Sequence, residues 1–131
     1  MISLRIRAAL AATALAVLTV PTPAQARPAT PPSQLRLTLR DDGSGATRAV
    51  ALRCEPTDGD HPRAREACEA LAPAGGDPEA LTGTPGVFCN HLYQPVTASA
   101  EGSWRGSPVR WRHSFANPCG LHTRTGPVFR F

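Results

Sequence analysis

The residues with the clearest chemical potential in this chain form one short run, Cys89-Asn90-His91-Leu92-Tyr93-Gln94-Pro95. A cysteine at the start of such a run can tie it to another part of the chain, and a proline near its end restricts the backbone. A protease binds an exposed, extended segment of this kind as a substrate, and a protein that is bound without being cut needs the same segment. The run is therefore either a binding loop or a stapled turn.

Outside this run, the residues that could serve in catalysis form no known catalytic motif. Histidine bases are available at four positions, His61, His91, His113 and His122. Hydroxyl groups are available at Ser103, Ser107 and Ser114, but no serine lies in a Gly-x-Ser-x-Gly motif. His113 alternates with Trp111 and Phe115 on one face of a predicted strand, which favours a core histidine over a catalyst. We therefore expect no enzymatic activity.

The N-terminus predicts export. Arg5 and Arg7 precede an uncharged apolar run over 8–20, and small residues follow at Ala24 and Ala26. This order is typical of a secretory signal peptide, here 1–26, that is cleaved after Ala26. A membrane span is less favoured, because the run is shorter than the roughly 20 residues that cross a bilayer. The expected product is secreted and has no membrane association.

Four cysteines in a small exported protein favour two disulfides, and all three pairings of Cys54, Cys68, Cys89 and Cys119 are open at this point. A zinc site is the competing interpretation. No Cys-x-x-Cys or His-x-x-x-His unit is present, so the spacing does not favour zinc. We expect neither a metal nor another cofactor.

Charge does not indicate a nucleic-acid partner. The 14 basic residues, all of them arginines, stand against 10 acidic residues and are scattered along the chain. A nucleic-acid-binding protein would concentrate them in a stripe. Solvated arginines on strand faces are the expected arrangement.

Hydrophobic periodicity predicts one mixed domain over 34–131 after a proline-containing, flexible arm over 27–33. Alternating apolar residues predict strands, and Gly or Pro signals bound two short helical segments. The predicted elements are strands at 35–39 and 50–54, a polar loop at 55–62, a helix at 63–72, a helical turn at 77–83, a hairpin of 96–100 with 109–115, and a closing strand at 128–131. The predicted class is α+β.

A series of short motifs also follows in a fixed order along the chain. They are Leu52-Arg53-Cys54, His61-Pro62, Ala67-Cys68-Glu69-Ala70-Leu71, Gly75-Gly76-Asp77, Ala80-Leu81-Thr82, Val87-Phe88-Cys89, Leu92-Tyr93-Gln94-Pro95-Val96, Gly102-Ser103-Trp104-Arg105-Gly106, Phe115-Ala116-Asn117-Pro118-Cys119 and Val128-Phe129-Arg130-Phe131. Together they strongly resemble the subtilisin inhibitor-like family of secreted bacterial serine protease inhibitors. The resemblance extends from about Ser33 to the C-terminus.

The resemblance implies a five-stranded antiparallel sheet with two short helices packed on it. It implies the disulfides Cys54–Cys68 and Cys89–Cys119. It further implies that His91–Leu92 is the reactive bond, which is offered to the protease as if for cleavage, and that Asn117 supports the loop from beneath. The remaining residues of the implied loop are Val87, Phe88, Cys89, Asn90, Tyr93, Gln94 and Pro95. The implied partner is a subtilisin-like serine protease, with a trypsin-like protease as the second choice.

Two loop residues depart from the family pattern. His91 stands where Met, Lys or Arg is usual, and a roomy subtilisin-like pocket suits it better than a trypsin-like pocket. Asn90 stands where relatives often carry proline, so some local stiffness is lost. Both departures bear on the target and the affinity.

Members of this family also form homodimers through their sheets. The outward face of the first predicted strand carries Arg36, Thr38 and Arg40, which is charged for an interface core. Two alternatives to inhibition stay open: a secreted binding module without inhibitory activity on the same scaffold and, more distantly, a small secreted hydrolase.

Overall fold

Alternating leucines place β1 (Ser33–Asp41) at the centre of an antiparallel sheet in the computed structural model, which describes residues 16–27 and 29–131. Leu35, Leu37 and Leu39 are buried on one face of this strand. In chain order the elements are β1 (Ser33–Asp41), β2 (Thr47–Cys54), β3 (Asp58–Gly59), α1 (Ala64–Leu71), η1 (Pro78–Ala80), β4 (Val96–Trp104), β5 (Ser107–Phe115), α2 (Pro118–Thr125) and η2 (Gly126–Phe129). The strand order across the sheet is β3-β2-β1-β4-β5.

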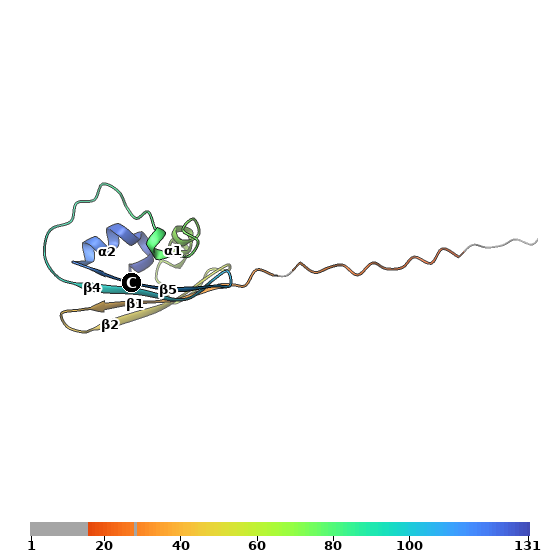
Figure 1. Ribbon diagram of the computed structural model, residues 1–131, viewed down its shortest axis with the longest axis horizontal. Coiled ribbons are helices and arrows are strands. Elements are labelled where there is room, and N and C mark those ends of the chain that lie inside the picture. The colour runs from red at the N-terminus through yellow and green to blue at the C-terminus, as the bar shows by residue number, and fades with distance from the viewer. Residues whose placement is uncertain (1–15, 28) are drawn as a thin grey trace, which may run out of the picture.

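Both α-helices lie on the same face of this sheet, and the other face is left open (Figure 1). The core fills the space between the two layers, where the leucines of β1 and the alanines of β4 meet Leu71 of α1, Leu121 of α2 and Phe129 of η2. Small residues at Ala98 and Ala100 leave room for these larger side chains. The predicted five-stranded α+β architecture with two helices is confirmed.

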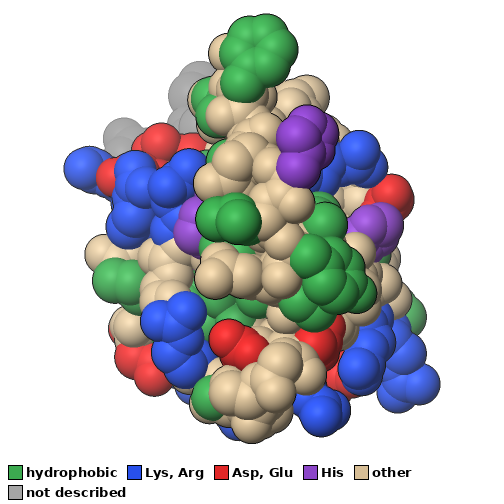
Figure 2. Space-filling model, turned by 90° about the vertical axis from the view of Figure 1, so that its left-hand side faces the viewer, with side chains coloured by type: hydrophobic (Ala, Val, Ile, Leu, Met, Phe, Trp, Pro, Cys, Tyr) green, Lys and Arg blue, Asp and Glu red, His purple; other side chains and the backbone are tan. Residues whose placement is uncertain are grey.

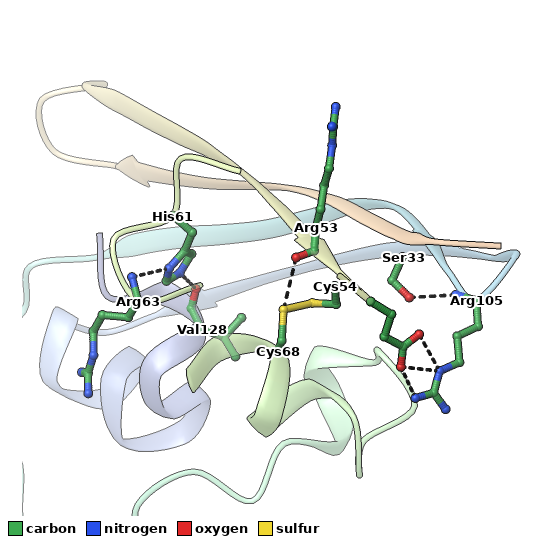
Figure 3. Close-up of a disulfide and its surroundings, with 9 residues drawn as sticks. Ser33, Arg53, Cys54, His61, Arg63, Cys68, Arg105 and Val128 are labelled. Carbon is green, nitrogen blue, oxygen red and sulfur yellow. Dashed lines mark hydrogen bonds and ion pairs between the residues drawn. A yellow bond between two sulfur atoms is a disulfide. The ribbon is translucent and has the colours of Figure 1, made fainter. Parts of the chain in front are cut away.

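The first disulfide fastens α1 to the end of β2. Cys54 and Cys68 are bonded, and their Cα atoms lie 5.7 Å apart (Figure 3). The helix buries Ala67, Cys68 and Leu71, the face predicted from the sequence. It ends where the Gly76 N–H donates to the Leu71 carbonyl, and Gly76 itself has a φ of 78°. A Cβ atom at this glycine would stand 2.2 Å from the ring of Trp104, so only glycine fits.

His61 is a structural residue. It is buried, its Nδ1 accepts the Arg63 N–H at 3.0 Å, and its Nε2 lies 2.9 Å from the Val128 carbonyl oxygen, to which it donates (Figure 3). Both ring nitrogens are therefore satisfied within the fold. The side chain ties the start of α1 to the C-terminal segment.

The predicted closing strand at 128–131 is wrong. The chain there forms η2, with Pro127 in its first turn. Val128 and Phe129 are both fully buried, whereas a strand with one solvent face would bury only alternate residues. The fifth strand is instead the two-residue β3, which pairs with β2 inside the stretch 55–62 that was predicted to be a loop.

The predicted hairpin is correct in its pairing but too short. β4 and β5 continue to Trp104 and from Ser107, so the turn is only Arg105-Gly106. Both turn residues have positive φ, 46° and 85°, as a type I′ hairpin turn requires. The Arg105 N–H donates to the Ser33 hydroxyl at 3.0 Å, and its guanidinium pairs with Glu55 (Figure 3).

His113 is exposed, so its prediction as a core histidine is wrong. It does share a face with Trp111 and Phe115, and its ring is stacked on Trp111 with centroids 6.1 Å apart. β5 is an edge strand, however, and the face that these three residues share is only partly covered: Trp111 and Phe115 are half-buried, whereas His113 between them is exposed. The alternation of apolar residues therefore predicted which side chains share a face of β5, but not whether other residues cover that face.

The residue pattern also missed α2. Asn117 caps this helix by accepting the Gly120 N–H at 2.9 Å, and Pro118 occupies its first turn. The cap-then-proline order that predicted η1 at Asp77-Pro78 therefore holds here too. The two helices are α1 and α2, and the predicted turn at 77–83 is the short η1.

Near the N-terminus, Ser33 belongs to β1 and is buried, so the segment before the domain ends one residue earlier than predicted. Residues 1–15 of the predicted signal peptide and Pro28 lie outside the described residues. Residues 16–26 contain neither helix nor strand. Within the described part of the chain, every helix is too short or too polar to cross a membrane.

Candidate functional site

A long loop without helix or strand, residues 81–95, joins η1 to β4 and arches away from the body of the molecule (Figure 1). It contains every residue of the predicted loop, from Val87 to Pro95. Viewed from this end, a narrow ridge with exposed hydrophobic side chains and a histidine projects from the surface (Figure 2). The most exposed apolar side chains of the loop are Phe88, Tyr93 and Leu92, at 99%, 79% and 59% exposed.

The centre of the loop rests on one buried side chain, Asn117, which is only 7% exposed. Its Nδ2 donates to the carbonyl oxygens of Asn90 and Leu92, at 3.1 and 3.0 Å. Its Oδ1 meanwhile accepts the Gly120 N–H of α2. One amide therefore holds both sides of the His91–Leu92 bond and caps the helix below.

The N-terminal limb of the loop is fastened to α2. Cys89 and Cys119 are bonded, with Cα atoms 5.7 Å apart, and the Thr123 hydroxyl lies 3.4 Å from the Cys89 sulfur. Earlier in the limb, the Thr84 N–H donates to the Thr123 carbonyl at 2.8 Å. At Gly83 a Cβ atom would lie 2.1 Å from that same carbonyl oxygen, so the close approach needs glycine.

The C-terminal limb is fastened to the sheet. The Gln94 N–H donates to the Ala116 carbonyl at 2.8 Å, and the Asp42 N–H donates to the Pro95 carbonyl at 3.0 Å. The Asp42 carboxylate accepts the hydroxyl of buried Thr97 at 2.7 Å, which connects the β1–β2 turn to the start of β4. Hydrogen bonds therefore hold this limb to Ala116, which follows β5, and to Asp42 in the β1–β2 turn.

The β1–β2 turn is itself stabilised by Asp41. Its carboxylate accepts the N–H groups of Ser44 and Gly43, at 2.8 and 2.9 Å. These hydrogen bonds, with that of Ser44 the largest contribution, hold the pKa of Asp41 below its ordinary value. The sequence predicted a turn at these residues but not the hydrogen bond between Asp42 and the loop residue Pro95. That contact depends on the pairing register of β1 with β4, which no local pattern specifies.

The predicted site residues thus fall into two groups. The loop residues meet Asn117 and the Cys89–Cys119 disulfide at one end of the molecule. Cys54 and Cys68 instead join β2 to α1 within the scaffold. Both disulfide pairings implied by the resemblance are confirmed. Every cysteine is paired, which leaves no thiol as a nucleophile.

The remaining histidines do not gather at the loop into a set of catalytic groups. His61 is a structural tie, His113 stacks on Trp111, and His122 is half-buried on α2. Burial, followed by the charges of Arg130 and Arg48, lowers the pKa of His122. Among residues 16–27 and 29–131, no cluster of three or more His, Cys, Asp or Glu side chains could hold a metal ion.

Comparison with known protein families identifies the chain: a family model described as subtilisin inhibitor-like matches residues 31–117. The chain belongs to the subtilisin inhibitor-like family. The match includes the whole loop and extends to Asn117. The resemblance inferred from the motifs is therefore confirmed.

Several relatives of this inhibitor-like domain come from Streptomyces. Subtilisin inhibitor-like protein 4 of Streptomyces lavendulae is 43% identical over 105 residues, which cover 76% of this chain and 90% of the relative. Subtilisin inhibitor-like protein 1 of Streptomyces cacaoi is 45% identical over 89 residues, which cover 66% of this chain and 81% of the relative.

A solved structure agrees with the fold of this subtilisin inhibitor-like chain. It is Streptomyces caespitosus sermetstatin, crystallised in complex with Bacillus licheniformis subtilisin. The similarity has a TM-score of 0.63 at 31% sequence identity and covers 77% of this chain and 100% of sermetstatin.

Proposed function

We propose that this protein inhibits subtilisin-like serine endopeptidases by presenting His91–Leu92 as a bond that is bound tightly and hardly cut. The observation that carries the proposal is the combination of exposure and restraint in one loop. The side chains on either side of the bond point to solvent, while the backbone is held by Asn117, by Cys89–Cys119 and by the Gln94 hydrogen bond. Membership in the family supports the same function.

Restraint of the loop accounts for affinity. A protease aligns the backbone of its substrate along the edge of its cleft and takes successive side chains into pockets. A flexible peptide loses conformational freedom when it binds, whereas this loop is already fixed on both limbs. Phe88, Leu92 and Tyr93 are exposed in the free protein, so their apolar surface is available for burial against the protease.

Restraint also accounts for resistance to cleavage. When the protease serine attacks the His91 carbonyl, the bond to the Leu92 nitrogen breaks and an acyl-enzyme forms. The Gln94 and Pro95 hydrogen bonds keep the new amine beside the acyl group, and the disulfide keeps the acyl fragment in place. An amine held in this way has a very high effective concentration and re-forms the peptide before water attacks.

His91 determines the target within this proposal. Its side chain enters the pocket of the protease that recognises the residue before the reactive bond. An imidazole is too short to reach an acidic group at the base of a trypsin-like pocket, and it fits a wide subtilisin-like pocket better. We therefore assign subtilisin-like proteases as the first target class and trypsin-like proteases as the second.

Export and self-association belong to the same proposal. A signal peptide over 1–26 would deliver the inhibitor to the extracellular space, where disulfides persist and its targets act. The open outer face of the sheet, in which Arg36, Arg110 and Arg112 are exposed, would form a homodimer interface. Because like charges meet in such an interface, sedimentation should reveal more dimer as salt is raised.

Titration of subtilisin with the purified protein tests the proposal. We expect residual activity to fall linearly to zero near one inhibitor per protease, with no hydrolytic activity of the protein itself. His91→Asp should weaken inhibition, because it would desolvate a charge in an unsuitable pocket. His113→Ala, which removes an exposed histidine outside the loop, should titrate like the parent. Unchanged subtilisin activity would indicate a non-inhibitory binding module and refute the proposal.

A further inference from the structure

We propose that Asn90 is a positioning residue for the inhibitory reaction, because its side-chain carbonyl holds the nitrogen of the reactive bond. This inference rests on the proposed function and concerns the step in which the cut bond is re-formed. The Leu92 N–H donates to Asn90 Oδ1 at 3.3 Å. That nitrogen is the one that would leave the His91 carbonyl during cleavage.

Asn90 is well placed to hold a group that has just been released. The preceding residue, Cys89, is fixed by its disulfide, and the Asn90 carbonyl oxygen accepts the Asn117 amide at 3.1 Å. The backbone of Asn90 is therefore fixed from two directions, which limits where its side chain can reach. Proline at this position would stiffen the backbone but would offer no side-chain acceptor.

Two side chains connect residues on both sides of the reactive bond by hydrogen bonds. Asn117 joins the carbonyl of Asn90 to the carbonyl of Leu92, and the Asn90 side chain reaches across to the Leu92 nitrogen. Asn90 lies on the acyl fragment and Leu92 on the amine fragment. The Cys89–Cys119 disulfide and the hydrogen bonds from Thr84 to Thr123 and from Asp42 to Pro95 also join the two fragments, but none of them reaches the atoms of the reactive bond. The Asn90 side chain contacts the reacting nitrogen itself.

The chemistry of religation gives the Asn90 contact a specific task. In the acyl-enzyme the protease serine oxygen is esterified to the His91 carbonyl carbon, and Leu92 carries a free amine. Its lone pair attacks that carbon, the carbon–nitrogen bond forms and the ester bond to the serine oxygen breaks. A proton leaves the nitrogen through the protease histidine and returns to the serine. Accepting one N–H of the amine at Oδ1 orients its lone pair toward the ester.

Burial in the complex makes this hydrogen bond stronger than it is in the free protein. It is exposed to water in the isolated chain. Bound protease excludes that water, and a hydrogen bond in a site of lower dielectric gains strength. The contact consequently acts mainly when subtilisin is bound, which is when religation competes with hydrolysis.

The test compares resynthesis of the reactive bond in three proteins that differ at one position. Purified inhibitor cleaved at His91–Leu92 is mixed with saturating subtilisin, so that affinity does not limit the rate, and intact chain is followed by mass spectrometry. Asn90→Leu has a similar size without an acceptor and should resynthesise about 2- to 10-fold more slowly, the range that one hydrogen bond supports. Asn90→Asp keeps the acceptor and should retain the parental rate within about twofold.

The outcomes separate the two proposals. If the parent inhibits and resynthesises but Asn90→Leu does so at the same rate, the role of Asn90 is refuted and the proposed function stands. If the parent neither inhibits nor yields intact chain, both proposals fail. Thermal melts of all three proteins serve as the control, since a purely structural role would lower the melting temperature of Asn90→Leu without slowing resynthesis at saturating protease.

Discussion

Replacement of Asn117 by Asp separates two functions that a single side chain performs. The Oδ1 atom caps α2, while the Nδ2 atom donates to the loop carbonyls of Asn90 and Leu92. Aspartate keeps an acceptor for the Gly120 N–H, and its charge suits the N-terminus of a helix. It removes the donor and faces two carbonyl oxygens with a carboxylate. The loop should therefore lose its central support while α2 keeps its cap.

The expected magnitude follows from the number of contacts. Each of the two lost hydrogen bonds contributes about 0.5–1.5 kcal/mol, so the restrained loop loses roughly 1–3 kcal/mol. That loss corresponds to inhibition weakened by roughly 5- to 150-fold, at about 1.4 kcal/mol for each factor of ten. Cleavage of the loop by subtilisin should accelerate as well, because the fragments separate more readily.

The assay measures inhibition constants against subtilisin and thermal melts for the parent, Asn117→Asp and Asn117→Ala. Alanine removes both the cap and the loop donors, and loss of such a cap costs about 1 kcal/mol. Asn117→Ala should therefore melt earlier than Asn117→Asp, whereas both variants should inhibit poorly because both lack the loop donors. An aspartate variant that inhibits within about twofold of the parent would refute support of the loop by the Asn117 amide.

Three further outcomes follow from the structure. Joint replacement of Cys89 and Cys119 by Ser should turn the inhibitor into a substrate that is cut after His91, and undiminished inhibition would show that the disulfide does not preorganise the loop. His91→Lys should gain trypsin inhibition because a long cation reaches an acidic pocket base, and melts should show unchanged folding; no gain would locate the reactive bond elsewhere. The hydrogen bond from Trp111 Nε1, followed by the charge of Arg124, holds the pKa of Glu79 below its ordinary value. The ionised Glu79 therefore stabilises the folded protein fully above about pH 4.3, and this contribution is lost as pH falls through the lower pKa of the folded state. Glu79→Gln should accordingly show a smaller drop in melting temperature between about pH 5 and 3 than the parent, and parallel curves would contradict this assignment.

Local patterns predicted the scaffold well where one residue's environment depends on its near neighbours. The alternation of Leu35, Leu37 and Leu39 identified β1, and the spacing of Ala67, Cys68 and Leu71 identified the buried face of α1. The pairing of β1 with β2 was likewise correct. In each case hydrophobic periodicity and turn residues agree, so the sequence specifies the element without reference to the rest of the fold.

Non-local packing decided the elements that the sequence did not predict correctly. Val128 and Phe129 have high strand propensity, yet the core accepts both side chains at once and the chain coils into η2. His113 has the alternation of a buried residue but lies on an edge strand whose inner face is only partly covered. No local pattern reports how far one layer extends over another.

For the loop, too, some features were predicted from local motifs and others were missed. Its residues, disulfide and Asn117 were all identified through the motifs of the family, because those motifs are contiguous in sequence. The Asp42 contact with Pro95 was not, since it depends on where the β1–β2 turn lies beside the loop. The hydrogen bond between the Asn90 side chain and the Leu92 nitrogen was also missed. In the sequence, asparagine at this position indicated only a loss of backbone stiffness relative to proline.

The bond that subtilisin cuts can be mapped directly. A small amount of subtilisin is incubated with excess inhibitor for an extended time, and the masses of the reduced products are determined. We predict a single cleavage, between His91 and Leu92, that stops at a stable mixture of intact and cut chains because religation balances cleavage. Cleavage at another bond, or digestion that continues until no intact chain is left, would show that His91–Leu92 is not a reactive bond protected by religation.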